Sequence, residues 1–262
     1  MYVNRVSATS ANPDKYSKDS VLDALQTVLA ALHMNGQVCG SEWPMLASGE
    51  TISAIVLSPE AQSLDARFNS KYVAAAMARC EDEGLLVTFE VLGEDAESPR
   101  ACLCPDPSAY VLFTSYISFA SPIRCMDCFR QVAMYRMKAM ASGEFYELLS
   151  WQSDFQSCDS LQMHCTVLEK QTTREMSDID SSLSKTGLAH CETLAASSNR
   201  PFYYYLYRGH GRSLHAELER RCPGCGSDWK LASQFHDLFD FKCDRCSLLS
   251  NVAFDVRWKS AP

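Results

Sequence analysis

Apolar positions recur with regular spacing along the first 93 residues. Residues 2–6 alternate between apolar and polar side chains, as a half-buried strand does. Residues 19–34 place apolar side chains on one helical face, which predicts a helix that Gly36 ends. The remaining periodicities predict paired strands at 37–43 and 51–57, a second helix at 66–80 and a strand at 85–92.

This order of elements, β-α-β-β-α-β, is typical of ferredoxin-like domains. We therefore predict that residues 1–95 form an α+β domain of ferredoxin-like type.

The middle of the chain mixes strands and helices. Residues 94–107 are polar, which predicts a linker or a long loop. Residues 110–119 are predicted to form an apolar strand, with 131–137 as its partner. Helices are predicted at 143–156, 160–175 and 183–196, followed by an aromatic-rich strand at 201–207. We predict an α+β domain over residues 96–215, with a strand hairpin and three helices, which makes the whole chain α+β.

The C-terminal residues 216–262 are predicted to form a zinc ribbon. Cys222, Cys225, Cys243 and Cys246 make two CxxC pairs separated by 17 residues, and paired knuckles of this kind present four thiolates to one Zn²⁺. The segment between them alternates like a hairpin, and residues 254–258 are predicted as a further strand. Because all four ligand positions are filled by the protein, the expected role of this zinc is structural.

A second group of cysteines is a candidate for another zinc site. Cys102 and Cys104 form a CxC pair, and Cys125 and Cys128 form a CxxC pair after 20 residues. A tight turn with reduced thiols remains the alternative interpretation. The other cysteines are interpreted as small buried apolar residues.

Composition and charge narrow the function classes. The sequence shows no run of 18 apolar residues and no secretory signal at its start, so we expect a cytoplasmic protein. The formal net charge is −8, but residues 1–199 carry −11 and residues 200–262 carry +3. This balance disfavours a duplex-binding protein, which normally has a strongly basic face.

No catalytic constellation stands out in the sequence. There is no Gly-rich phosphate loop, no GxSxG and no HExxH motif. The His164–Cys165 and His190–Cys191 pairs lie on predicted helices, where adjacent side chains do not face each other. The acidic residues of these helices, Asp159 among them, are interpreted as a solvated face. We therefore expect no enzymatic activity and no small-molecule substrate.

Several stretches together resemble a known family. The segments 121–129, 201–206, 222–225 and 236–251 resemble a bacterial family of unknown function, described as zinc-ribbon-containing and as a candidate for nucleic-acid binding. The resemblance covers about residues 100–260. It implies zinc carried by Cys222, Cys225, Cys243 and Cys246, and it carries over no catalytic residue.

Two functions follow as expectations. The first is a non-catalytic zinc protein that binds another protein, most sharply an immunity protein that neutralises a basic bacterial toxin, because an acidic body complements such a partner. The alternative is a nucleic-acid-binding or transcription-associated zinc-ribbon protein. Its candidate contacts are Arg208, Arg212, Lys230, Lys242 and Arg245. Stacking of bases on tyrosines 203–207 would belong to that alternative. The sequence names neither the partner nor the oligomeric state.

Overall fold

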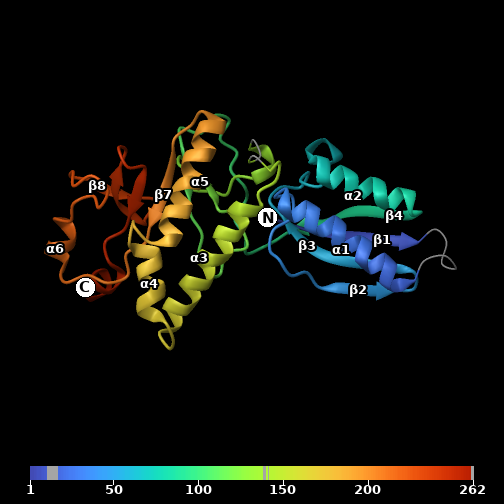
Figure 1. Ribbon diagram of the computed structural model, residues 1–262, viewed down its shortest axis with the longest axis horizontal. Coiled ribbons are helices and arrows are strands. Elements are labelled where there is room, and N and C mark those ends of the chain that lie inside the picture. The colour runs from blue at the N-terminus through green and yellow to red at the C-terminus, as the bar shows by residue number, and fades with distance from the viewer. Residues whose placement is uncertain (11–16, 138–139, 141, 261–262) are drawn as a thin grey trace. The chain divides into compact units, whose positions relative to one another are not determined.

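Alternating buried and half-buried residues build a four-stranded antiparallel sheet in the first part of the chain (Figure 1). A computed structural model describes residues 1–10, 17–137, 140 and 142–260. The chain divides into two units in it. The first comprises Met1–Leu103, Phe119–Ser121 and Arg130–Tyr146, and the second comprises Cys104–Ser118, Pro122–Phe129 and Glu147–Pro262.

The elements of the first unit follow the predicted order β-α-β-β-α-β. They are β1 (Tyr2–Ser10), α1 (Lys18–Met34), β2 (Met45–Ser48), β3 (Thr51–Ser58), α2 (Lys71–Asp82) and β4 (Leu85–Glu94). In the sheet the strands lie in the order β2-β3-β1-β4. Two short 3-10 turns, Ala66–Phe68 and Met134–Arg136, complete the unit.

One face of this sheet carries the core. Val6 and Ala8 of β1 pack with Leu25 and Leu29 of α1 and with Val73 of α2, all fully or nearly fully buried. The opposite face is lined by hydroxyl pairs, Ser7 with Ser53 and Thr9 with Thr51. The two helices therefore cover a single face, and β2 and β4 are the edge strands.

Two predicted elements of this unit need correction. Residues 37–43 do not form a strand, because Gly36 and Gly40 turn the chain with positive φ; Cys39 makes one bridge to Leu57, and the partner of β3 is β2. The helix predicted at 66–80 is also shorter. Ser70 accepts a hydrogen bond from Val73 N–H and so caps a helix that begins at Lys71.

The second unit contains a six-stranded mixed sheet. Its elements are β5 (Tyr110–Leu112), β6 (Ile123–Cys125), α3 (Tyr146–His164), α4 (Glu169–Ser177), α5 (Ser182–Ser198), β7 (Phe202–Leu206), α6 (Leu214–Leu218), β8 (Lys230–Phe235), β9 (Phe239–Cys243), β10 (Leu248–Ser250) and α7 (Phe254–Ser260). The strand order is β6-β5-β7-β10-β9-β8. One sheet thus includes strands from both sides of residue 215.

The aromatic strand β7 occupies the centre of this sheet. It pairs in parallel with β5 on one side and with β10 on the other. Strands with parallel neighbours are usually covered on both faces, and all five residues of β7 are buried. The hydroxyl of Tyr205 reaches the side chain of Asn251 at 2.9 Å, which satisfies one buried polar group.

Three strand predictions for the middle and C-terminal parts of the chain fail. The strand predicted at 110–119 ends at Leu112, and its partner is β6, which precedes the Cys125–Cys128 turn. Residues 131–137 do not pair with it because Phe129, with φ of 57°, redirects the chain after that turn. Residues 254–258 lie in helix α7 rather than a strand, since Arg257 N–H bonds to the carbonyl of Ala253.

Candidate metal centres

The four C-terminal cysteines converge on one point. The sulfur atoms of Cys222, Cys225, Cys243 and Cys246 all lie within 4.8 Å of one another, and the Cys225 and Cys243 sulfurs are 3.6 Å apart. Zinc bound by four thiolates at about 2.3 Å in a tetrahedron sets neighbouring sulfurs roughly 3.8 Å apart. The spacing matches a metal tetrahedron, and every one of the thirteen cysteines, all in the described part of the chain, is outside a disulfide.

Close packing around the sulfurs depends on a glycine. A Cβ atom on Gly224, inside the first CxxC turn, would lie 2.8 Å from the Cys246 sulfur. No side chain fits there without separating the two turns. The small residue in Cys222-Pro-Gly-Cys225 is therefore what allows the two cysteine pairs to meet.

The backbone after each cysteine pair has the same conformation. Gly226 and Ser247, which follow the two C-terminal CxxC pairs, have φ of 70° and 51°. The Gly226 N–H closes the first turn by bonding to the carbonyl of Cys222 at 2.8 Å. Both knuckles thus end in a left-handed residue, which reverses the chain and leaves both thiols of a pair on one side.

Local hydrogen bonds favour the thiolate form of one cysteine in this cluster. The hydroxyl and backbone of Ser227 lower the pKa of Cys225 to about 6. Burial, followed by the neighbouring sulfurs, raises the pKa of Cys246, and burial also raises that of Cys243. Four adjacent thiolates therefore require a cation among them, and binding such a cation would release protons.

The donor set fits a closed, four-coordinate site. Soft thiolates in a tetrahedral set select zinc or related soft metals. All four donors come from the protein, which leaves no coordination position for a water or substrate. A metal held by Cys222, Cys225, Cys243 and Cys246 would stabilise the fold and would not act as a Lewis acid.

The second cysteine group also comes together. The sulfurs of Cys102, Cys104, Cys125 and Cys128 lie within 4.8 Å of one another. The Cys125–Cys128 turn repeats the C-terminal knuckles, because Phe129 N–H bonds to the Cys125 carbonyl at 2.9 Å and Phe129 has φ of 57°. Two tetracysteine clusters of the chain are thus arranged to hold a metal ion.

His236 was not singled out by the sequence patterns, yet it contacts this second knuckle. Its Nε2 lies 2.6 Å from the carbonyl oxygen of Met126, inside the Cys125–Cys128 turn. Its ring stacks on Phe129, with ring centroids 5.1 Å apart and planes at 19°. A histidine at the tip of the β8–β9 hairpin therefore packs directly against a cysteine pair more than 100 residues earlier in the chain.

Comparison with known proteins places the chain in a family. A model for a domain of unknown function (DUF2310) matches residues 104–207. An uncharacterised protein of Haemophilus influenzae is 34% identical over 236 residues, which make up 88% of this chain and 90% of that protein. The chain belongs to this bacterial family.

Other comparisons extend over the rest of the chain. Two further domains of unknown function, DUF8589 and DUF8594, match residues 1–93 and 211–256. A second uncharacterised Haemophilus influenzae protein is 37% identical over 167 residues, which are 64% of this chain and 82% of that protein. The resemblance to a bacterial family of unknown function is confirmed at that level. Because the matched domains have no described activity, the family's function must be inferred from its residues.

The candidate nucleic-acid contacts of this family member lie in different settings. Arg208 is paired with the buried carboxylate of Glu217 at 2.8 Å, and Lys242 lies 2.9 Å from Asp244. Arg212, Lys230 and Arg245 are exposed. Tyrosines 203–205 and 207 are all buried, so none of them is positioned as an open platform for a base.

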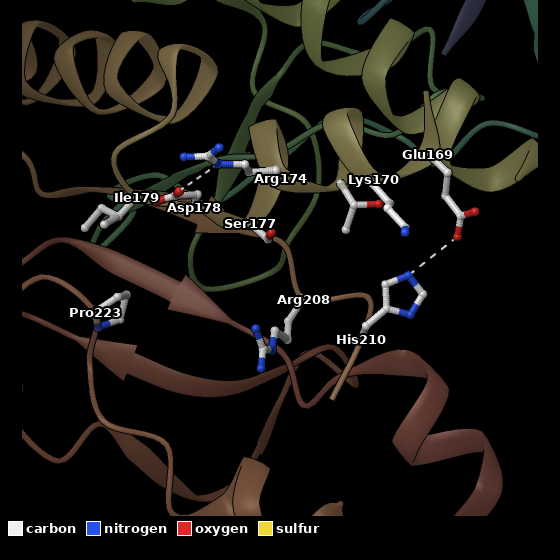
Figure 2. Close-up of a pocket in the computed structure, with 10 residues that line it drawn as sticks. Glu169, Lys170, Arg174, Ser177, Asp178, Ile179, Arg208, His210 and Pro223 are labelled. Carbon is white, nitrogen blue, oxygen red and sulfur yellow. Dashed lines mark hydrogen bonds and ion pairs between the residues drawn. The ribbon is translucent and has the colours of Figure 1, made fainter. Parts of the chain in front are cut away.

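A polar pocket of about 490 Å³ lies beside Arg208 (Figure 2). Lys170, Arg174 and His210 line it together with Arg208, and Pro223 of the first C-terminal knuckle forms part of its wall. Carboxylates already engage three of these four groups, Arg208 through Glu217. His210 lies 3.7 Å from Glu169, and Arg174 lies 3.3 Å from Asp178.

Asp159 corrects the prediction of a solvated acidic face. It is only 9% exposed, and its carboxylate accepts a hydrogen bond from the Tyr116 N–H at 2.8 Å. Burial raises the pKa of this carboxyl. Cys165 also departs from its prediction, because this cysteine was expected to be buried and is exposed. Cys191 is buried, as predicted for the cysteines outside the paired motifs, and the adjacent His190 is buried as well.

No helix in the described residues is both long enough and apolar enough to span a bilayer.

Proposed function

We propose that this chain is a non-catalytic zinc protein whose two tetracysteine clusters each hold a structural Zn²⁺. The observation that carries the proposal is the convergence of Cys222, Cys225, Cys243 and Cys246 within 4.8 Å, with all four donors supplied by the protein. On this proposal residues 216–262 are a zinc ribbon. The order of strands and helices in residues 1–95 likewise supports a ferredoxin-like unit.

Metal content tests this part directly. Purified protein is expected to contain two zinc ions per chain. Cys243→Ser should remove one of them and lower the free energy of unfolding by about 4 kcal/mol or more, because losing a structural metal is among the largest single-residue effects. Cys165→Ser, which changes an exposed cysteine outside both clusters, is the matched control. A well-folded wild-type protein without zinc would refute the proposal.

We further infer that the protein acts by binding another protein through β4. This strand is an edge of its sheet, and Leu86, Phe89, Val91 and Leu92 on it are exposed. A long apolar edge strand is open to pairing with a strand from another chain. Residues 81–97 also carry seven acidic side chains and no Lys or Arg, so the expected partner has a basic surface. In its most specific form, the proposal is that this chain is an immunity protein that binds a basic toxin.

Matched substitutions on the two edges of the sheet test this surface. Val91→Lys lies on β4 and Leu46→Lys lies on β2, and the two side chains are 51% and 54% exposed in the protein. Tagged variants would be used to capture partners from the native host, followed by quantitative mass spectrometry. A basic protein should be recovered with wild type and Leu46→Lys but should fall roughly tenfold with Val91→Lys. Equal recovery with both variants would contradict the proposed surface.

The pocket in Figure 2 favours nucleic-acid binding as a second candidate function. Lys170, Arg174 and Arg208 line one pocket of the second unit, and phosphates are the usual ligands of such a cluster. On this alternative, affinity for a mixed DNA and RNA pool falls steeply with salt, and Lys170→Gln lowers the slope by about one. Lys185→Gln, an exposed lysine outside the pocket, should leave it unchanged. Absence of salt-dependent binding would leave protein binding as the function.

A further inference from the structure

A second cavity of about 440 Å³ lies entirely within the second unit, and its lining is mainly apolar. The chain after β5, helix α3, strand β7 and helix α7 each contribute to it. Its aromatic lining includes Phe113, Tyr116, Phe155, Tyr205, Tyr207 and Phe254. A cavity of this size and lining is typical of sites for small molecules.

Two buried polar side chains of this cavity, Asp159 and Gln162, present hydrogen-bond acceptors. Asp159 is nine-tenths buried, and among the described residues its carboxylate has one hydrogen-bond donor, the Tyr116 N–H. Gln162, one turn later on α3, is 7% exposed, and its side-chain oxygen has no partner among the described residues. None of the described lining residues is Lys or Arg. The cavity therefore holds the acceptors of Asp159 and Gln162 with no lysine or arginine beside them. Of its donors, the Tyr205 hydroxyl already bonds to Asn251 and the His210 ring already faces Asp255.

A buried carboxylate without a cation is costly, because transfer from water removes most of its solvation. A ligand with a positive charge would compensate for this loss of solvation, because it stabilises the carboxylate inside the cavity. Aromatic rings also attract cations through their negative faces. Tyr116, Ile117 and Met163 line the same cavity and are exposed, which leaves room for an apolar ligand body at its mouth.

We propose that this cavity binds a small organic cation, an ammonium group on an aromatic or apolar body, with the Asp159 carboxylate as its counter-ion. Gln162 accepts a second hydrogen bond from the ammonium. This site is independent of the zinc clusters and of the β4 surface, so its test does not depend on either.

A charged probe and its neutral analogue test the proposal by calorimetry and by NMR of the intact, zinc-loaded protein. The wild type should bind 2-phenylethylammonium at least about tenfold more tightly than 2-phenylethanol, because hydrogen bonds to charged groups exceed neutral ones by roughly that factor. Asp159→Asn keeps the shape and an acceptor for Tyr116 N–H. It should abolish the preference, so that the two probes bind with similar affinity.

Two further variants keep the test decisive. Asp154→Asn makes the same change on an exposed position of α3 outside the cavity lining, and it should retain the full preference. Ile117→Lys adds a competing cation at an exposed position, 69% accessible, so it should weaken binding of the ammonium more than of the alcohol even if Asp159→Asn fails to fold. Equal binding of both probes to wild type, or no saturable binding of the ammonium at millimolar concentration, would overturn the proposal.

Discussion

At the scale of single residues, the backbone after each CxxC pair is the most informative feature. Phe129, Gly226 and Ser247 all have positive φ, a conformation that costs non-glycine residues free energy. The sequence places a glycine at only one of the three positions. The chain therefore tolerates strain at two knuckles, which is consistent with a metal ion that supplies more free energy than the strain consumes.

Ser247→Gly should consequently stabilise the protein. We expect the free energy of unfolding to rise by about 0.5–1 kcal/mol, because glycine adopts positive φ without steric cost. Chemical denaturation of the zinc-loaded protein measures the change. Ser233→Gly, on strand β8 with extended backbone, should instead destabilise by a similar amount. A loss of stability with Ser247→Gly would contradict the strain argument.

His33 provides a pH dependence in the first unit. Burial lowers its pKa, although its ring nitrogen lies 3.3 Å from the Val38 carbonyl. The unfolded chain, with an ordinary histidine pKa of about 6.5, therefore takes up a proton first as pH falls. The contribution of neutral His33 to stability is present above that value and is lost as pH falls through it toward the lower folded pKa.

Hydrogen exchange of the α1 amides should report this loss. Protection in wild type should decrease as pH is lowered below about 6.5, once the intrinsic exchange rate is corrected for. His33→Gln should flatten the dependence, and His164→Gln, an exposed histidine of the other unit, should not. An unchanged pH slope in His33→Gln would show that another group carries the effect.

At the scale of elements, the β8–β9 hairpin links the two cysteine-bearing regions of the second unit. His236 and Asp237 form its tip with φ of 51° and 54°, and Leu238 N–H bonds to the Phe235 carbonyl. The tip places the His236 ring on Phe129 and its Nε2 at the Met126 carbonyl. The hairpin is thus part of the support for the Cys125–Cys128 knuckle.

His236→Ala should weaken that support. We expect a loss of about 1–2 kcal/mol, since the Met126 carbonyl loses its hydrogen-bond donor and the ring contact with Phe129 is removed. Hydrogen exchange in residues 125–129 should become faster. His215→Ala, a largely exposed histidine on α6, is the control. If His236→Ala leaves exchange in the knuckle unchanged, the hairpin does not brace it.

Elements with strong local signals were predictable from the sequence, and long-range pairings were not. Helix α1 could be predicted because its buried face repeats at helical spacing and Gly36 follows it. The shortened β5 and the helical α7 depend on where distant groups lie, such as Asn251, whose side chain bonds to the Arg208 backbone. The C-terminal cysteines were identifiable from spacing alone. Asp159 was not, because its burial requires residues 113–117 to fold over α3.

At the scale of the whole molecule, metal binding and folding of the second unit should be one event. Strand β9 ends at Cys243, and β10, which follows the knuckle, pairs with the central strand β7. A structural zinc contributes roughly 10–16 kcal/mol of apparent binding free energy in small zinc domains. That magnitude equals or exceeds the total stability of a typical domain, about 5–15 kcal/mol. On the proposed zinc site, the bound metal therefore decides whether this sheet persists.

Removal of zinc by a strong chelator should destabilise the second unit and leave the sheet of the first unit stable. Hydrogen-exchange protection in β7, β9 and β10 should collapse, while β1 and β3, whose sheet contains no cysteine, should keep theirs. Re-addition of zinc should restore the lost protection, which distinguishes metal loss from irreversible damage. Metal analysis must show that zinc has left. A metal-free protein that retains full protection across β7 to β10 would mean that the cysteine clusters do not hold this fold together.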